Sequence, residues 1–228
     1  MQAASFSTSA SLIYRPASWV ERLPLRGMFS PPEPERRAPA RLVEAAPDRA
    51  ERELGAPPLE VELGSGDGSF LAQWAAAFPE RNFLGVERLL GRLRKLDRKA
   101  RRAGLANVRL LRIEAGYFLE YLLPAACVHA LHVYFPDPWP KRKHRKHRLV
   151  NERFPGLAAK ILVPRGLVYL RTDDADYFAQ MREVFAMDKR FVAGETPNDL
   201  ALVVTDFERD FHTRGVITRR AAYRLERV

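Results

Sequence analysis

The stretch that decides the fold reads Leu59-Glu60-Val61-Glu62-Leu63-Gly64-Ser65-Gly66-Asp67-Gly68. Its first five residues are typical of a buried strand, and the glycines come where that strand meets a helix predicted at residues 68–78. Gly64 and Gly66 have no Cβ, so the backbone can approach a ligand closely, and a helix N-terminus offers N–H donors to a carboxylate or phosphate. An ordinary strand-to-helix turn has the same residues, so the interpretation depends on the rest of the chain.

Beyond this turn, short apolar runs alternate with longer helical patterns. We predict further strands at residues 82–86, 108–113, 128–135 and 166–171, and helices at 88–103, 147–163 (broken near Pro155) and 174–187. The remainder is expected to mix short strands with a loop. This alternation predicts an α/β fold, with a doubly wound, mostly parallel sheet of about seven strands.

The domain is expected to span residues 59–228. Residues 1–28 are rich in Ser and Ala, and prolines recur between 31 and 58, which prevents long regular elements. We therefore interpret residues 1–58 as an N-terminal extension, flexible or loosely docked, whose first part also resembles a transit peptide.

Acidic residues come at the ends of successive predicted strands. Glu62 lies inside the end of the first strand, and Glu87, Glu114 and Asp137 follow the next three. Because the carboxyl ends of parallel strands meet at one edge, we predict that these acids share a pocket there. Glu87 stands where an acid would bind both hydroxyls of a ribose, and Glu114 would reach an adenine amino group. Any one of them alone could equally be a helix cap or a solvated charge.

The glycine pattern favours a cofactor without phosphates. A dinucleotide fingerprint would require glycine where this chain has Ser69, and Glu62 would lie close to a pyrophosphate. S-adenosylmethionine combines a positive centre, an amino group, a carboxylate and an adenosine. We therefore predict that Glu62, Gly64, Gly66, Glu87, Glu114 and Asp137 bind S-adenosylmethionine.

The most distinctive stretch is Phe135-Pro136-Asp137-Pro138-Trp139-Pro140. Its prolines stiffen a loop that presents Asp137 and Trp139, an acid and an aromatic that could hold an extruded base. Six of the next eight residues, 141–148, are Lys or Arg, which favours phosphate binding, although a solvated face or a localisation signal would look similar. A second basic element, residues 88–112, carries ten Lys or Arg and could extend this surface for a folded RNA.

The amino-acid composition indicates which kinds of partner and environment suit this protein. The 228 residues include 38 Lys and Arg against 28 Asp and Glu, a net charge of +10, which favours a polyanion. No stretch is apolar and long enough for a membrane span. The single cysteine, Cys127, forms no internal disulfide and favours a reducing, cytoplasmic setting. No metal is expected, since His132, His144 and His147 stand mostly among cationic neighbours.

Four motifs together resemble the bacterial tRNA (guanine-N7-)-methyltransferases: residues 62–66, 136–141 with the basic continuation, Thr172-Asp173, and residues 205–209. The resemblance covers residues 59–228 and implies a Rossmann-like class I methyltransferase that moves a methyl group from S-adenosylmethionine to N7 of guanosine 46 in the variable loop of tRNA. It also implies that Asp137 is catalytic and that the substrate contacts are Lys141, Asp173, Thr205, Asp206, Phe207 and Glu208. The chain departs from the family at Glu114, usually Asp, and at Pro140, often polar or His.

Other interpretations stay open at this point. The glycine turn and Glu87 would also suit a nicotinamide-dependent oxidoreductase, and the basic run would suit a non-catalytic RNA-binding protein. A methyltransferase acting on another RNA or on a small molecule is a third alternative. The sequence does not decide between a monomer and a homodimer.

Overall fold

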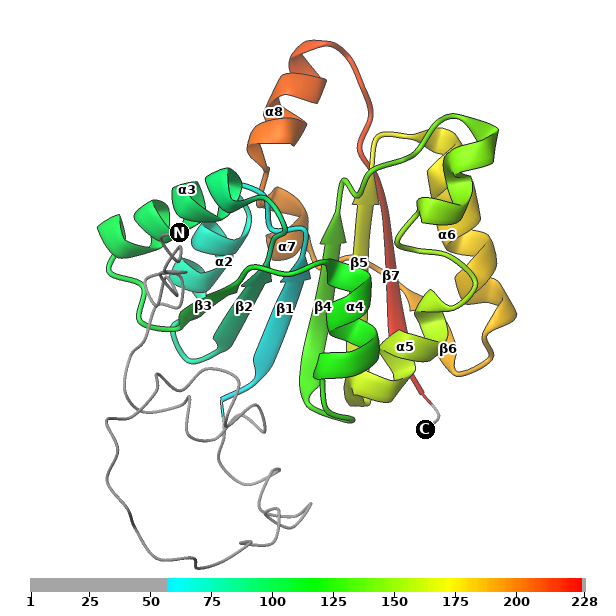
Figure 1. Cartoon of the computed structure of the whole chain (residues 1–228), viewed down its shortest axis with the longest axis horizontal. Coiled ribbons are helices and arrows are strands. Elements are labelled where there is room, and N and C mark those ends of the chain that lie inside the picture. Colours follow the sequence, from blue (N-terminus) through cyan, green and yellow to red (C-terminus); the bar gives the residue numbers. More distant parts are fainter. Residues whose placement is uncertain (1–56, 227–228) are drawn as a thin grey trace, which may run out of the picture.

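A computed structural model describes residues 57–226, which form one seven-stranded sheet (Figure 1). The strand order is β3-β2-β1-β4-β5-β7-β6. Strands β1 to β5 are parallel, and β7 runs antiparallel to both of its neighbours. The strands are β1 (Leu59–Leu63), β2 (Asn82–Val86), β3 (Val108–Leu111), β4 (Val128–Tyr134), β5 (Leu162–Thr172), β6 (Phe191–Gly194) and β7 (Arg219–Leu225).

Helices cover both faces of the sheet. They are α2 (Leu71–Ala77), α3 (Leu90–Arg102), α4 (Ala115–Tyr117) continuing into the π-helix η3 (Phe118–Leu122), the 3-10 helix η4 (Arg142–His147), α5 (Phe154–Ile161), α6 (Ala175–Met187), α7 (Asn198–Leu202) and α8 (Asp206–Thr213). One apolar core packs α2, α3 and α7 on one face, and a larger one packs η3, α5 and α6 on the other. The predicted doubly wound α/β fold is confirmed.

The topology determines where a ligand can bind. The chain moves from β1 towards β3 and then returns to place β4 on the other side of β1. The connections after β1 and β4 therefore diverge, and such a point in an open parallel sheet leaves a crevice at the carboxyl ends of the strands. Helix α8 rises above this carboxyl edge (Figure 1).

Several predicted elements differ from the structure. Helix α2 begins at Leu71, because residues 64–68 form a turn with three glycines at positive φ. The helix predicted at residues 147–163 is too long, since only residues 154–161 form α5, and Pro155 does not break it. This proline lies in the first turn of α5, where its missing N–H costs nothing. Strand β5 is longer than predicted, and the C-terminal remainder also contains α7 and α8. Residues 1–56 of the expected extension lie outside the described residues.

Candidate functional site at the carboxyl edge of the sheet

The glycine turn uses its N–H groups internally. Gly64 and Ser65 both donate to the Val86 carbonyl, at 2.8 and 2.9 Å, and Gly66 donates to Oε2 of Glu87 at 3.0 Å. The N–H groups of these three residues are therefore not free to bind a phosphate, contrary to the donors expected at this turn. A Cβ on Gly64 would meet no heavy atom within 4 Å, so its backbone borders open space.

Gly68 differs from the other two glycines, because it is needed for helix packing. A Cβ built there would lie 2.0 Å from Cδ1 of Leu96 on α3. This glycine, one position before Ser69, therefore allows α3 to pack against the turn, and the chain needs no glycine at 69 for that contact.

Glu62 is the most unusual acid of the site. It is buried at the end of β1, and its Oε2 has no hydrogen-bond partner among the described residues. Burial, with smaller contributions from the nearby charges of Asp67 and Glu87, raises the pKa of Glu62 to about 8 against the opposing charge of Arg171. An uncompensated buried carboxyl group is suited to receiving a cation.

The other predicted acids follow the adjacent strands. Glu87, after β2, is buried and accepts from the N–H groups of Gly66 and Leu89. Glu114, after β3, is exposed and caps α4, its two oxygens accepting from the N–H groups of Gly116 and Tyr117 at 2.8 and 2.7 Å. The sheet therefore brings the acids to one edge, as the sequence predicts.

Asp137 lies on a loop with an unusual backbone. Phe135 and Trp139 on either side have φ of 50° and 44°, in the left-handed region that side chains rarely adopt. The Asp137 carboxylate is exposed and accepts from the Trp139 N–H at 3.0 Å. Strained backbone of this kind persists only when surrounding contacts hold it.

Those contacts come from Arg148, the last residue of the basic run. Its buried guanidinium donates to the Pro138 carbonyl at 2.7 Å, to Gln180 at 2.8 Å and to Asp176 at 2.6 Å. Arg148 thus ties the Asp137 loop to α6 and is not available to phosphates. Lys141 and the Lys and Arg residues of η4 are exposed, and their binding of phosphates stays a prediction.

Helix α8 separates the predicted substrate residues into two groups. Thr205 and Glu208 form a capping box and are buried, whereas Asp206 and Phe207 are exposed. Both Glu208 oxygens are engaged, with Arg171 and Arg220 each at 2.9 Å. Thr205 and Glu208 thus hold α8 in place through buried contacts, and the substrate contacts that the resemblance implied for them stay a prediction. Asp173, just after β5, is partly exposed at the same edge.

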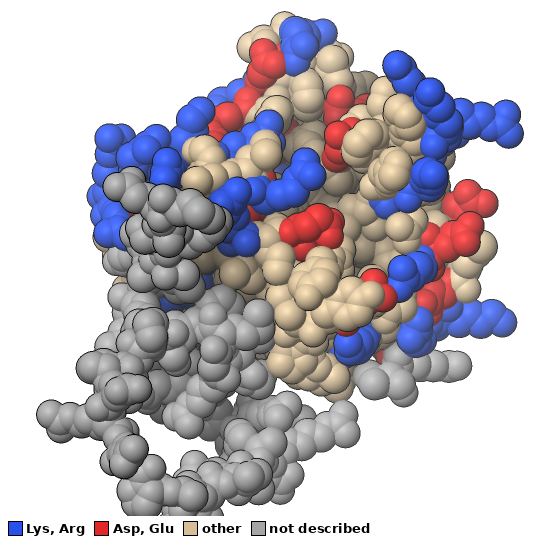
Figure 2. Space-filling model, viewed as in Figure 1, with Lys and Arg blue, Asp and Glu red and all other residues tan. Residues whose placement is uncertain are grey.

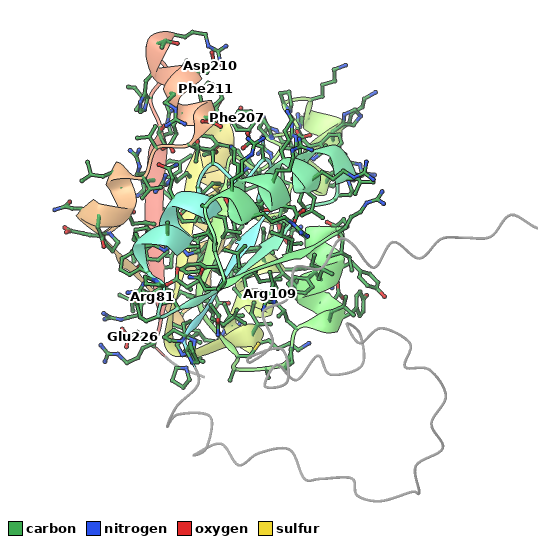
Figure 3. All side chains as sticks on the ribbon, turned by 90° about the vertical axis from the view of Figure 1, so that its left-hand side faces the viewer. Arg81, Arg109, Phe207, Asp210, Phe211 and Glu226 are labelled. Atoms are coloured by element: carbon green, nitrogen blue, oxygen red, sulfur yellow. The ribbon has the colours of Figure 1, made fainter. Side chains whose placement is uncertain are left out.

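Three phenylalanines connect α8 to the Asp137 loop. The Phe135 ring centroid lies 6.4 Å from that of Phe207 and 5.6 Å from that of Phe211. Phe207 keeps 46% of its surface exposed. Figure 3 shows Phe207 and Phe211 on α8, at the opposite end of the molecule from Arg81 and Arg109.

Sequence reasoning missed Arg148, Arg171 and Phe135. The signal for α8 was present, because Thr205 to Glu208 has the Thr-x-x-Glu spacing of a capping box. No comparable signal separates a buried arginine from an exposed one. Among the described residues, no group of three His, Cys, Asp or Glu could hold a metal ion. In residues 57–226 no helix combines the length and apolarity needed to cross a membrane.

Comparison with known proteins identifies the family. Residues 56–221 match the family model described as "Putative methyltransferase". A tRNA (guanine-N(7)-)-methyltransferase of Rubrobacter xylanophilus is 37% identical over 175 residues, which cover 75% of this chain and 76% of the relative. The chain belongs to the tRNA (guanine-N7-)-methyltransferase family.

Other members of this methyltransferase family match a shorter segment. Proteins of the same name from Halorhodospira halophila and Syntrophotalea carbinolica are 39% and 42% identical over 60% and 53% of this chain. The matched segments span 59% and 52% of those relatives, little more than half of their length.

Solved structures agree on the fold. The 16S rRNA methyltransferase KamB superposes with a TM-score of 0.55 at 16% identity, covering 78% of this chain and 92% of KamB. TrmN from Thermus thermophilus gives 0.54 at 16% identity, covering 77% of this chain and 46% of TrmN. At this identity the likeness shows the methyltransferase fold alone.

Proposed function

We propose that this protein transfers the methyl group of S-adenosylmethionine to N7 of a guanosine in the variable loop of tRNA, at position 46. The observation that carries the proposal is the row of carboxylates Glu62, Glu87, Glu114 and Asp137 along one sheet edge, joined directly to the exposed cations of η4. Acids suit a positively charged methyl donor, and cations suit the backbone of an RNA. The curated names of the family members support the same substrate.

The residues at the carboxyl edge fit the methyl donor. Glu62 has an unpartnered buried oxygen and a raised pKa, so a positive group beside it would stabilise its ionised form. Glu87 holds the glycine turn and would accept from ribose hydroxyls, and Glu114 would accept from the adenine amino group. When bound, S-adenosylmethionine supplies a methyl group on a positively charged sulfur. A geranyl diphosphate C-methyltransferase of Streptomyces coelicolor with this fold, TM-score 0.51, contains S-adenosyl-L-homocysteine.

Asp137 would act on the guanine. Guanine N7 has an exposed lone pair, so the protein needs no base to create the nucleophile, and positioning dominates. The Asp137 carboxylate would accept from the N1 and N2 protons of the base, fixing its orientation. Because the guanine becomes positively charged as N7 is methylated, this carboxylate favours the transition state more than the bound substrate.

The remaining residues would hold the RNA. Lys141 and the cations of η4 would bind phosphates, and Phe207, Asp206 and Asp173 would face the substrate. Thr205 and Glu208 would position α8 through their buried contacts. The proposed catalytic domain is residues 59–228, and a tRNA substrate agrees with the cytoplasmic location expected from the sequence.

A direct experiment tests the proposal. Purified protein is incubated with methyl-labelled S-adenosylmethionine and an unmodified tRNA transcript, and N7-methylguanosine is mapped by cleavage at the modified base. We expect label at guanosine 46 and none in a matched transcript with adenosine at that position. Label elsewhere, or tRNA binding without any label, would refute the proposed activity and favour another RNA substrate or a non-catalytic binding protein.

A further inference from the structure

Helix α3 has one apolar side and one strongly cationic side. Leu93, Leu96 and Ala100 are buried against the sheet. Seven of its 13 residues are Lys or Arg, and Asp97 is its single acid. We define the α3 basic face as Arg94, Lys95, Arg98 and Arg102, which lie on the side opposite the buried stripe and are all exposed. Figure 2 shows Lys and Arg gathered over α3.

The acidic side chains that the structure describes do not neutralise this face. Lys99 pairs with Asp67 and Asp206, and Asp97 pairs with Arg101. No ion pair to the four residues of the α3 basic face occurs among residues 57–226. Their charges are therefore available to a partner.

The closely spaced cations of this face also destabilise helix α3. Arg94 and Arg98, like Arg98 and Arg102, are like charges four residues apart, which destabilises a helix by about 0.2–0.5 kcal/mol per pair. The first turn has no acid to complement the helix dipole. A helix whose outer side served only as a solvated surface would be more stable with mixed charges, so the pattern is better explained by binding.

The position of α3 relates this face to the carboxyl edge. The helix begins three residues after Glu87, and Lys99 links it to α8 through Asp206 at 3.3 Å. On the other side of the edge, η4 carries the second group of cations, seen at the upper right of Figure 2. A polyanion lying across the carboxyl edge would therefore meet cations on both sides of the acids.

We infer that the α3 basic face is a second phosphate-binding surface, which holds the tRNA backbone on the side of the site opposite η4. The inference rests on the proposed tRNA substrate. An anionic membrane is a poorer partner, because a helix that lies in a membrane inserts its apolar side, and here Leu93 and Leu96 are already packed against the sheet.

The test is the triple variant Arg94→Gln/Lys95→Gln/Arg98→Gln. Its net charge is 10 − 3 = +7. Binding of an unmodified tRNA transcript is measured from about 50 to 200 mM salt. Each lost phosphate contact lowers the slope of log K against log salt by roughly 0.7 to 0.9, so we expect a slope smaller by about 2 to 3 and an affinity at least tenfold lower at low salt. Binding of S-adenosylhomocysteine should be unchanged.

The matched control has the same loss of charge elsewhere. Arg182, Lys189 and Arg224 are exposed cations distant in sequence from α3, and their triple Gln variant also has a charge of +7. We expect this control to bind tRNA within about twofold of the wild type. An α3 variant that binds tRNA with the affinity and slope of the control would overturn the inference. So would loss of binding to phosphatidylglycerol vesicles with tRNA binding intact.

The two proposals fail separately. If the wild type binds tRNA through α3 but places no methyl group on it, the α3 inference stands and the proposed activity is refuted. If the α3 variant methylates and binds tRNA as the control does, the activity stands and the α3 surface is refuted.

Discussion

Two glutamates on one strand show how neighbours decide the state of a buried acid. Glu60 and Glu62 lie on the same face of β1, and both are buried. Burial would raise the pKa of Glu60, but hydrogen bonds from His132, Arg81 and Trp74 outweigh it and lower the pKa to about 2. Glu62 lacks such donors, and its pKa rises to about 8. One acid therefore stabilises the fold, and the other is the acid that we propose to bind the cofactor.

Glu62→Gln should stabilise the ligand-free protein in a pH-dependent way. The folded-state pKa of Glu62 is above its unfolded value of 4.5, so its favourable contribution is complete below pH 4.5 and is lost as pH rises towards 8. Between pH 5 and 8 the wild type should lose about 3 kcal/mol more than the variant, measured by urea unfolding at each pH. The variant should also bind S-adenosylmethionine more weakly. Equal pH dependence in the two proteins would show that Glu62 is not a buried, uncompensated acid.

Asp137→Asn isolates the charge of the proposed catalytic residue. The Asn side-chain oxygen can still accept from the Trp139 N–H, so the loop should keep its shape. Losing a preorganised charge of this kind costs roughly 3 kcal/mol, so we expect kcat to fall about 100-fold or more with tRNA affinity nearly unchanged. Single-turnover methylation and a separate binding assay measure the two quantities. Near-normal turnover would remove Asp137 from the mechanism.

We expect the aromatic ring of Phe207 to contribute to methyl transfer by stacking on the guanine. Its exposed ring lies beside Phe135, two residues before Asp137, where a guanine could stack on it. Aromatic stacking on a base is worth about 1–3 kcal/mol, and the attraction grows as the base becomes cationic. Phe207→Leu should therefore lower kcat/KM by about tenfold, whereas Phe207→Tyr should retain most of it. If the Leu variant matched the Tyr variant, the ring would have no stacking role.

At the scale of elements, the position of α8 depends on buried charges. Arg171 of β5 and Arg220 of β7 both pair with Glu208, and Arg171 also donates to the carbonyls of Val203 and Leu200. Removing one member of a buried ionic group leaves the others uncompensated, which typically costs 3–5 kcal/mol.

Glu208→Gln should therefore loosen α8 as well as destabilise the fold. We expect a lower Tm and faster amide hydrogen exchange in residues 206–213, with kcat reduced because Phe207 is no longer held. Asp210→Asn is the control, since Asp210 is exposed on the same helix and pairs only with Arg214 among the described residues. Unchanged exchange in α8 would contradict the anchoring role.

The succession of strands and helices along the chain and the acids at the strand ends could be predicted from sequence, because apolar runs and the residues after them are local patterns. The roles of individual arginines could not. Arg148 looks like part of a phosphate-binding run, but its partners Asp176 and Gln180 lie 28 and 32 residues later. Whether a cation is buried depends on tertiary contacts of this kind. For Thr205 and Glu208 the informative signal was local. Their spacing is that of a helix capping box, but the family resemblance led us to interpret them only as substrate contacts.

At the scale of the whole molecule, the two ends of the sheet have different roles. At the amino end of β1, Glu60, Arg81 and Trp74 form a hydrogen-bonded group with His132, whose pKa is lowered because burial disfavours its charged form. At the carboxyl end, Oε2 of Glu62 has no hydrogen-bond partner among the described residues, and Asp137 is exposed. The hydrogen-bonded group at the amino end stabilises the fold and so offsets the free-energy cost of unsatisfied polar groups at the carboxyl end. Such a cost is expected at functional sites, where a ligand supplies the missing partners.

A ligand that satisfies the carboxyl edge should therefore stabilise the whole fold. At a concentration of 100 times its Kd, S-adenosylmethionine should add about 2.7 kcal/mol, which for a domain of this size raises Tm by about 5–10 °C. NAD should give little shift, because the N–H groups of Gly64, Ser65 and Gly66 are already bonded and cannot bind a pyrophosphate. Differential scanning fluorimetry over a range of ligand concentrations measures both. A larger shift with NAD than with S-adenosylmethionine would mean that the acids of the carboxyl edge do not select a cationic cofactor.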